Sequence, residues 1–171
     1  EWVSAFHSKI NERKQITTEE LSPLCREILT DTIEKDKSLD LTTYETKIKV
    51  GLDKRRINFS IEEIKELADY SLNVWQNYIT LSGDAHYVLS FLKDKYKTAL
   101  VTNFDHSKHV RRVLNEHKLF DFFEHVIISD EVEINKPDRR IFEIALSKCG
   151  LKAEETIFVG DNLNDDIKGA L

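Results

Sequence analysis

The chain has 171 residues, of which 40% are apolar and 33% are charged, and its formal net charge at pH 7 is −6. This length and apolar content suffice for a buried core, whereas no apolar run is long enough to span a bilayer, so we expect no membrane partner. The negative charge and the lack of a basic tract disfavour nucleic acid as a partner. Two cysteines, Cys25 and Cys149, are too few for a disulfide scaffold or a zinc site, and no secretory signal is recognisable, so we expect a reduced, cytoplasmic setting.

The first half of the chain has the residue spacing of helices. Apolar residues recur along one helical face in three stretches, namely Trp2, Phe6 and Ile10, then Tyr44, Ile48 and Leu52, and then Ile64, Ala68 and Leu72. Ser22 before Pro23 predicts a cap and the first residue of a helix, and Ser60-Ile61-Glu62-Glu63 predicts a capping box at the start of another. Residues 1–80 are therefore predicted to form a helical unit, with Leu81-Ser82-Gly83 as a hinge.

From Asp84 onward, helical patterns alternate with short apolar runs. The runs at 98–101, 125–129 and 156–159 predict buried strands. Helices are predicted at 85–92, from a Ser107 cap to about His117, and from Pro137 to Cys149, where Gly150 ends the helix. Such alternation is typical of a parallel sheet with right-handed crossovers, so residues 81–171 are predicted to be an α/β core.

Polar residues stand where these strands end, which is where ligands bind in open parallel sheets. They lie in three segments: Leu100-Val101-Thr102-Asn103, then Asn135-Lys136-Pro137-Asp138 with the four residues after it, and then Val159-Gly160-Asp161 with Asp166 five residues later. In this order, the three segments resemble the second, third and fourth motifs of the haloacid dehalogenase-like hydrolase superfamily. The resemblance spans residues 84–171, and the helical first half resembles the cap that this family inserts before its second motif. It implies a Rossmann-like parallel sheet with an inserted helical cap.

The family's first motif, Asp-x-Asp-x-Thr, is nowhere in the sequence. In the family this motif supplies the nucleophilic aspartate, and its strand is central in the sheet, between the strand that ends at Thr102 and the one that ends at Gly160. We therefore expect the first-motif strand and the C-terminal end of the core to be absent from this sequence. As written, the chain cannot perform the family's reaction.

The resemblance assigns roles that agree with simple electrostatics. Attack of a carboxylate on a phosphate ester brings two anions together, so positive charge and a metal must offset their repulsion. Mg²⁺ needs only one or two carboxylates beside water and phosphate, and Asp161 is the better direct ligand, while Asp166 acts through a metal-bound water or orients Lys136. The Lys136 ammonium suits a phosphoryl oxygen. Thr102 would offer its hydroxyl, and Asn103 its backbone N–H, to the transferring phosphoryl group.

The leading hypothesis is a Mg²⁺-dependent phosphatase that acts on a small phosphorylated metabolite through an aspartyl-phosphate. One alternative is a 2-haloacid dehalogenase, a reaction that needs no metal, and Gly160-Asp161 argues against it. Another alternative is a non-catalytic binding or regulatory module that kept the fold and lost the nucleophile.

Each residue also has a purely structural interpretation. Lys136 could be a solvated loop lysine, Thr102 a strand end, and Asp161 and Asp166 a turn former and a helix-start acid. Their joint occurrence in family order favours a site. Residues outside these motifs are predicted to be structural: exposed helix positions for His106, His109 and His117, and the core of the helical unit for Trp2 and Trp75.

Overall fold

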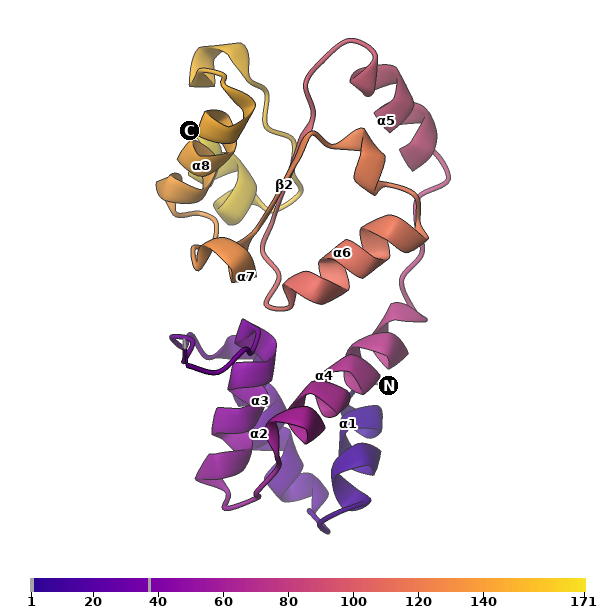
Figure 1. Ribbon diagram of the computed structural model, residues 1–171, viewed down its shortest axis with the longest axis vertical. Coiled ribbons are helices and arrows are strands. Elements are labelled where there is room, and N and C mark those ends of the chain that lie inside the picture. The colour runs from indigo at the N-terminus through magenta and orange to yellow at the C-terminus, as the bar shows by residue number, and fades with distance from the viewer. Residues whose placement is uncertain (1, 37) are drawn as a thin grey trace. The chain divides into compact units, whose positions relative to one another are not determined.

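The chain divides into two units, Glu1–Thr80 and Leu81–Leu171, in the computed structural model, which describes residues 2–36 and 38–171 (Figure 1). The boundary lies beside the Leu81-Ser82-Gly83 segment. That the first unit serves as a cap and the second as a catalytic core stays a prediction. Within the described ranges, no helix combines the length and the apolar character needed to cross a membrane.

The first unit consists of helices α1 (Trp2–Asn11), α2 (Thr18–Thr30), α3 (Thr43–Lys54) and α4 (Ile61–Gln76). Helix α1 packs against α4, and α2 packs against α3. Their buried apolar side chains form the core of this unit: Phe6, Ile10, Leu21, Leu24, Ile28, Ile48, Leu52, Ile64 and Leu67. The helices predicted from apolar spacing are confirmed. Trp2 is half-buried and donates to the Tyr44 hydroxyl, whereas Trp75 is exposed, so its placement in the core was wrong.

Capping boxes start α2, α3 and α4. The box at Ser60 was predicted, but Ser22 and Pro23 do not start a helix. Helix α2 begins at Thr18, because the Thr17 hydroxyl accepts the Glu20 N–H and the Glu20 carboxylate accepts the Thr17 N–H at 3.0 Å. Pro23 therefore lies inside the helix, which forms despite the one backbone hydrogen bond that a proline cannot donate.

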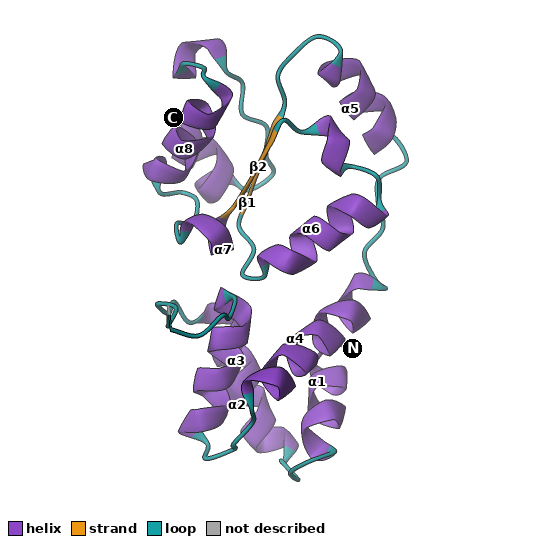
Figure 2. Cartoon of the chain, in the orientation of Figure 1, coloured by secondary structure: helices purple, strands orange, loops and turns teal. Residues whose placement is uncertain are grey.

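The second unit alternates helices and strands: α5 (Ala85–Lys93), β1 (Ala99–Thr102), α6 (Ser107–Glu116), β2 (His125–Ile128), α7 (Ser129–Val132) and α8 (Arg139–Cys149). A short helical turn, η1 (Phe120–Phe122), lies between α6 and β2, and η2 (Ala153–Glu155) and the π-helical η3 (Leu163–Lys168) follow α8. Strands β1 and β2 run parallel, with Ala99 opposite His125 and Thr102 opposite Ile128 (Figure 2). Helix α8 packs on both strands through Ile141. The α/β fold class is thus confirmed.

The third predicted strand, at residues 156–159, is not formed within the described part of the chain. Its side chains alternate as a strand's would: Phe158 packs edge-on against Phe142 at 5.0 Å, while Ile157 and Val159 are 90% and 87% exposed. A strand also needs a neighbour for its backbone N–H and C=O groups. Strand β1 pairs with β2, and the described residues provide no other strand as a partner. Residues 156–159 therefore have the apolar residues of a strand but not the backbone hydrogen bonds of a sheet.

Two helix starts in this unit differ from the prediction. Helix α8 begins at Arg139, not at Pro137, because the Asp138 carboxylate accepts the Arg140 N–H at 2.9 Å and so caps it. The C-terminal end of α8 was predicted correctly, since Gly150 adopts the left-handed conformation with φ of 64°. Helix α6 is capped by His106, whose Nδ1 accepts a backbone N–H at 3.1 Å, and not by Ser107.

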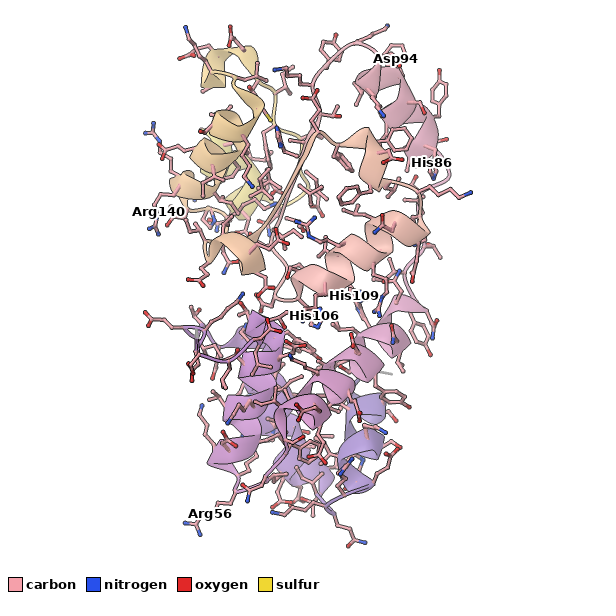
Figure 3. All side chains as sticks on the ribbon, in the orientation of Figure 1. Arg56, His86, Asp94, His106, His109 and Arg140 are labelled. Carbon is pink, nitrogen blue, oxygen red and sulfur yellow. The ribbon has the colours of Figure 1, made fainter. Side chains whose placement is uncertain are left out.

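The histidines of α6 were predicted to be exposed, and this is wrong for two of them. His106 and His109 are only 1% and 2% exposed. His106 and His109 are labelled beside α6 in Figure 3. His106 is buried as the helix cap, and the His109 ring stacks on Phe104 with 5.6 Å between ring centroids. His117, at the end of the helix, is half-buried.

Candidate active site

Lys136 lies in the turn before α8, and its side chain returns to the carboxyl end of β1. The ammonium Nζ donates to Asp166 Oδ1 at 2.6 Å and to the Val101 carbonyl at 3.2 Å, and it lies 5.6 Å from the centre of the Phe158 ring. The Lys136 and Asp166 side chains are only 11% and 6% exposed. Because an ammonium has three N–H donors and two have acceptors in the described residues, one donor is left for a ligand oxygen.

Asp166 is held on both of its carboxylate oxygens. Oδ1 accepts from Lys136, and Oδ2 accepts the Asn162 N–H at 3.0 Å. The hydrogen bond from Lys136 is the main reason that the pKa of Asp166 is lowered, and the Asn162 N–H adds to the effect. Asp166 is therefore an anion placed to orient the ammonium, which is one of the two roles predicted for it.

Gly160 allows Asp166 to fold back onto the turn. A Cβ atom at residue 160 would lie 2.3 Å from Asp166 Cγ, closer than real Cβ contacts. Asn162 supports the same turn, because its side-chain oxygen accepts the N–H groups of Asn164 and Asp165 at 2.9 and 3.0 Å. The sequence Gly-Asp-Asn thus folds into a turn that presents the Asp166 carboxylate to Lys136.

The side chain of Asn103 has a role that was not predicted. Its side-chain amide hydrogen-bonds the backbone of Lys136 on both sides: Oδ1 accepts the Lys136 N–H at 2.8 Å, and Nδ2 donates to the Lys136 carbonyl at 2.9 Å. The prediction concerned the backbone N–H of Asn103 and a phosphoryl group, and it stays untested. Sequence reasoning missed the side-chain contact because the two residues are 33 positions apart.

Two residues after β2 hold the turn that follows β1. The Ser129 hydroxyl accepts the Phe104 N–H at 3.0 Å, and the Asp130 carboxylate accepts the Ser107 N–H at 2.9 Å. Both Ser129 and Asp130 are buried. Sequence reasoning did not single them out, although a Ser-Asp pair directly after an apolar run could have signalled polar groups at a strand end.

The structure brings together only some of the predicted residues. Lys136, Asp166 and Asn103 are joined by hydrogen bonds, and Thr102 ends β1 directly after Val101. Asp161 is exposed, one residue after Gly160. Asp165 accepts a hydrogen bond from Asn164 at 3.1 Å, whereas the hydrogen bond from the Lys136 ammonium goes to Asp166.

The assignment of Asp161 and Asp166 as metal ligands stays a prediction. Among the described residues, no group of three or more histidine, cysteine, aspartate or glutamate side chains could hold a metal ion. A carboxylate such as Asp161 is the oxygen donor that Mg²⁺ prefers, and Mg²⁺ keeps several waters, so one ligand of this kind fits. Both oxygens of Asp166 already accept hydrogen bonds, which fits an orienting role better than direct ligation.

The N-terminus of α8 carries further cations, each paired with a carboxylate. Arg140 donates to Asp138 through two nitrogens, at 3.1 and 2.7 Å, and these hydrogen bonds lower the pKa of Asp138 to about 2. The Arg140 side chain lies on the outside of the unit (Figure 3). Arg139 is exposed and pairs with Glu143 at 2.9 Å.

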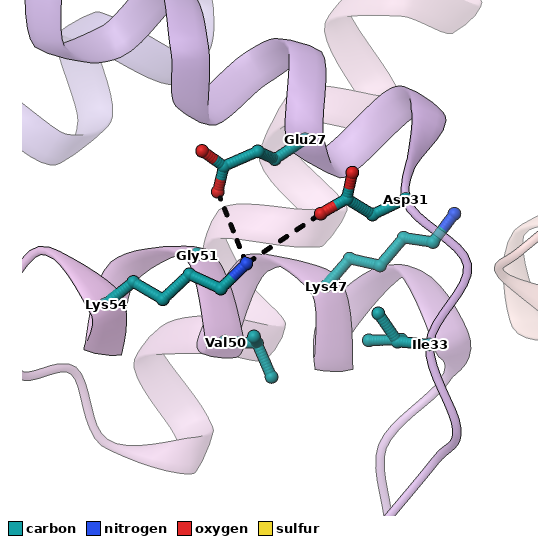
Figure 4. Close-up of a pocket in the computed structure, with 7 residues that line it drawn as sticks. All are labelled: Glu27, Asp31, Ile33, Lys47, Val50, Gly51 and Lys54. Carbon is teal, nitrogen blue, oxygen red and sulfur yellow. Dashed lines mark ion pairs between the residues drawn. The ribbon is translucent and has the colours of Figure 1, made fainter.

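A pocket lies in the first unit. Its lining residues fall between positions 27 and 54 and include none of the predicted site residues. It is lined by Glu27, Asp31, Ile33, Lys47, Val50, Gly51 and Lys54 (Figure 4). Lys54 Nζ lies 3.7 Å from a Glu27 oxygen and 3.8 Å from an Asp31 oxygen, and Arg55 also pairs with Glu27 at 2.7 Å. Because its acids and bases compensate one another, this pocket presents no strong charge to a ligand.

A sequence model described as haloacid dehalogenase-like hydrolase matches residues 16–171, so the chain belongs to this family. Among curated proteins, it is similar to the glyceraldehyde 3-phosphate phosphatase of Pyrococcus furiosus, with 42% identity over 83 residues, which are 48% of this chain and 34% of that protein. It is also similar to haloacid dehalogenase-like hydrolase domain-containing protein 3 of Danio rerio, with 33% identity over 70 residues, which are 41% of this chain and 28% of that protein. The match thus spans about a third of these relatives.

Among solved structures, the chain resembles a haloacid dehalogenase-like phosphatase from Thermococcus onnurineus. The TM-score is 0.67 at 25% identity, and the match covers 99% of this chain and 71% of that one. The predicted family and fold are therefore confirmed.

Proposed function

We propose that this chain is part of a phosphatase that hydrolyses a small phosphorylated metabolite. The observation that carries the proposal is the Lys136 ammonium, which donates to Asp166 and to the carbonyl of Val101 and has one N–H donor without an acceptor in the described part of the chain. A phosphoryl oxygen would accept a hydrogen bond from that N–H donor, and the fixed positive charge would offset the negative charge on the phosphoryl oxygens in the transition state. The similarity to the Pyrococcus furiosus phosphatase supports this substrate class.

Each site residue of this chain would have its own role in phosphate binding or catalysis. Lys136 binds a phosphoryl oxygen, Asp166 keeps the ammonium oriented and charged, and the Thr102 hydroxyl donates to a second oxygen. Asp161 would hold Mg²⁺, which when bound supplies positive charge to the phosphate oxygens. The nucleophilic aspartate that would carry the phosphoryl group as an aspartyl-phosphate has to come from outside these 171 residues, which contain no Asp-x-Asp.

The experiment compares two proteins, the 171 residues alone and a version with the family's Asp-x-Asp strand placed ahead of residue 1. Turnover of a generic phosphate ester is measured with Mg²⁺ and with a chelator. We expect turnover only in the longer protein and only with Mg²⁺. Turnover that persists in the chelator would contradict the metal assignment. A longer protein that folds but turns over no phosphate ester would favour a binding module.

Variants of the longer protein test the individual roles. Lys136→Met should lower kcat by about 100-fold, the scale for loss of one preorganised electrostatic partner. Lys136→Arg should restore little, because a planar fork does not replace a compact ammonium. Lys49→Met is the matched control, since Lys49 lies in the first unit and forms an ion pair with Asp53 on the surface. A folded Lys136→Met protein with the turnover of the control would remove Lys136 from the site.

The metal role is tested separately at the two carboxylates of the turn after residue 160. Asp161→Asn should abolish most of the Mg²⁺-dependent turnover, whereas Asp165→Asn should have a much smaller effect, because Asp165 is engaged with Asn164. Equal losses at the two positions would show that the metal ligand is misassigned.

A further inference from the structure

Asn103 joins two segments that are far apart in the sequence. It stands in the turn after β1, whereas Lys136 stands in the turn between α7 and α8. The amide uses its oxygen for the Lys136 N–H at 2.8 Å and its nitrogen for the Lys136 carbonyl at 2.9 Å. Of the short polar side chains, only that of asparagine presents an acceptor and N–H donors together in this way, because a carboxylate only accepts and a hydroxyl is a single atom.

The backbone of Lys136 depends on this contact. Helix α7 ends before Glu133, which adopts the left-handed conformation with φ of 56°, and α8 begins only at Arg139. Within the described chain, the Lys136 N–H donates to no backbone carbonyl, and the Asn103 side chain takes that place. The turn that carries the lysine is thus held by a side chain and not by secondary structure.

Both ends of Lys136 are tied to the same end of β1. Its backbone is held by Asn103, and its ammonium donates to the Val101 carbonyl at 3.2 Å. The turn that contains Asn103 is itself fixed to the end of β2, since Ser129 accepts the Phe104 N–H. Asn103 is therefore anchored on the sheet and can set the position of Lys136.

We infer that Asn103 is a positioning residue of the proposed active site, which places the Lys136 ammonium against the phosphoryl group by holding the Lys136 backbone. The inference rests on the proposed function. Without the amide, the Lys136 backbone would lose its two hydrogen bonds to Asn103, and Lys136 would be held near β1 only through the ammonium at the end of its flexible side chain. A misplacement of about 1 Å can cost up to roughly 100-fold in rate.

The first measurement needs no activity, and it starts with the wild-type protein. Native-state exchange of the Lys136 amide hydrogen is followed by NMR, and we expect it to be protected although it lies outside helices and strands. Asn103→Ala should accelerate this exchange by about 2- to 10-fold, the factor for one neutral hydrogen bond. Asn103→Asp, which keeps an acceptor for the N–H, should retain most of the protection. A Lys136 amide that exchanges without protection in the wild type would overturn the inference, even if no variant folded.

The second measurement is turnover of the longer, active protein described above. Asn103→Ala should lower kcat by about 10- to 100-fold and change KM much less, because the variant removes a side chain that hydrogen-bonds Lys136 and keeps the Asn103 backbone N–H. The matched control is Asn11→Ala in the first unit, where Asn11 Oδ1 likewise accepts a backbone N–H, that of Ile16, at 2.8 Å. This control should expose the Ile16 amide to exchange and leave kcat unchanged.

The two measurements separate this inference from the proposed function. Faster Lys136 exchange together with lower kcat supports the positioning role. A lower kcat with unchanged exchange would overturn it and point to direct contact between Asn103 and substrate, and faster exchange with unchanged kcat would overturn it as well. If the wild-type protein turns over no phosphate ester, the proposed function fails and the positioning role fails with it, whereas the exchange data still decide whether Asn103 holds the Lys136 backbone.

Discussion

Replacing Gly160 with alanine tests how tightly the site is built. The added Cβ would lie 2.3 Å from both Cγ and Oδ2 of Asp166 and 2.4 Å from its Cβ. Asp166 cannot simply turn aside, since its oxygens are held by Lys136 at 2.6 Å and by the Asn162 N–H at 3.0 Å. Either the turn must shift or the ion pair must open.

Both routes cost stability. Overpacking of a well-packed site typically costs about 1–3 kcal/mol, and a hydrogen bond to a charged group contributes about 1.5–3 kcal/mol. We therefore expect Gly160→Ala to lower the free energy of unfolding by about 2 kcal/mol. Gly83→Ala is the matched control: nothing lies within 4 Å of its added Cβ, so we expect no loss and a gain of up to about 1 kcal/mol.

The assay is urea unfolding followed by far-UV circular dichroism. Tryptophan fluorescence does not report on the second unit, because Trp2 and Trp75 both lie in the first. The NMR shift of the Asn162 amide, which donates to Asp166, reports locally on the turn. If Gly160→Ala were as stable as Gly83→Ala and left the Asn162 shift unchanged, the close packing of Asp166 on residue 160 would be refuted.

Three further predictions concern charge and capping. The pKa of Asp166 in the folded protein is lowered chiefly by its hydrogen bond from Lys136. The ionised carboxylate therefore stabilises the folded protein fully at pH values above the ordinary aspartate pKa of about 3.9. This stabilisation is lost as the pH falls through the lower pKa of the folded state. Lys136→Met should accordingly be less stable than wild type by about 1.5–3 kcal/mol at pH 7, and the gap should close in acid; a gap that is constant from pH 7 to pH 2 would contradict the pair. A carbon-detected NMR titration should give Asp138 a pKa of about 2 that rises toward the ordinary value in Arg140→Ala, and an unchanged value would exclude Arg140 as the cause. Ser60→Ala should lower the stability of the first unit by about 1 kcal/mol in a tryptophan-fluorescence melt, because it removes the cap of α4, and no loss would show that the capping box contributes little.

Much of the helical structure could be predicted from local sequence. The Ser60 capping box and the Gly150 stop rely on hydrogen bonds between residues a few positions apart, and both were predicted correctly. The error at Pro23 has a local cause too, since the stronger signal at Thr17 and Glu20 was overlooked. His106 shows a different limit, because a histidine side chain is an unusual helix cap and is not recognised by residue type.

For the candidate site, the sequence by itself determined which residues stand at the ends of the apolar runs, because strand ends and turns follow from residue type and order. Lys136 and Asp166 were named in advance because their segments resemble the third and fourth motifs of the family. Their contact at 2.6 Å, across 30 residues, and the hold of Asn103 on Lys136, across 33, came only from the tertiary structure. No local pattern encodes which of several turn residues will meet once the strands are aligned.

The same distinction separates the apolar runs from the strands. The sequence showed that the run at 156–159 is apolar and predicted a buried strand there. That prediction was wrong for Ile157 and Val159, which are exposed, because only the half-buried Phe158 packs against the rest of the unit. Whether the run joins the sheet was decided by tertiary structure, because a strand satisfies its backbone only through a neighbour, and β1 has β2 as its paired strand among the described residues.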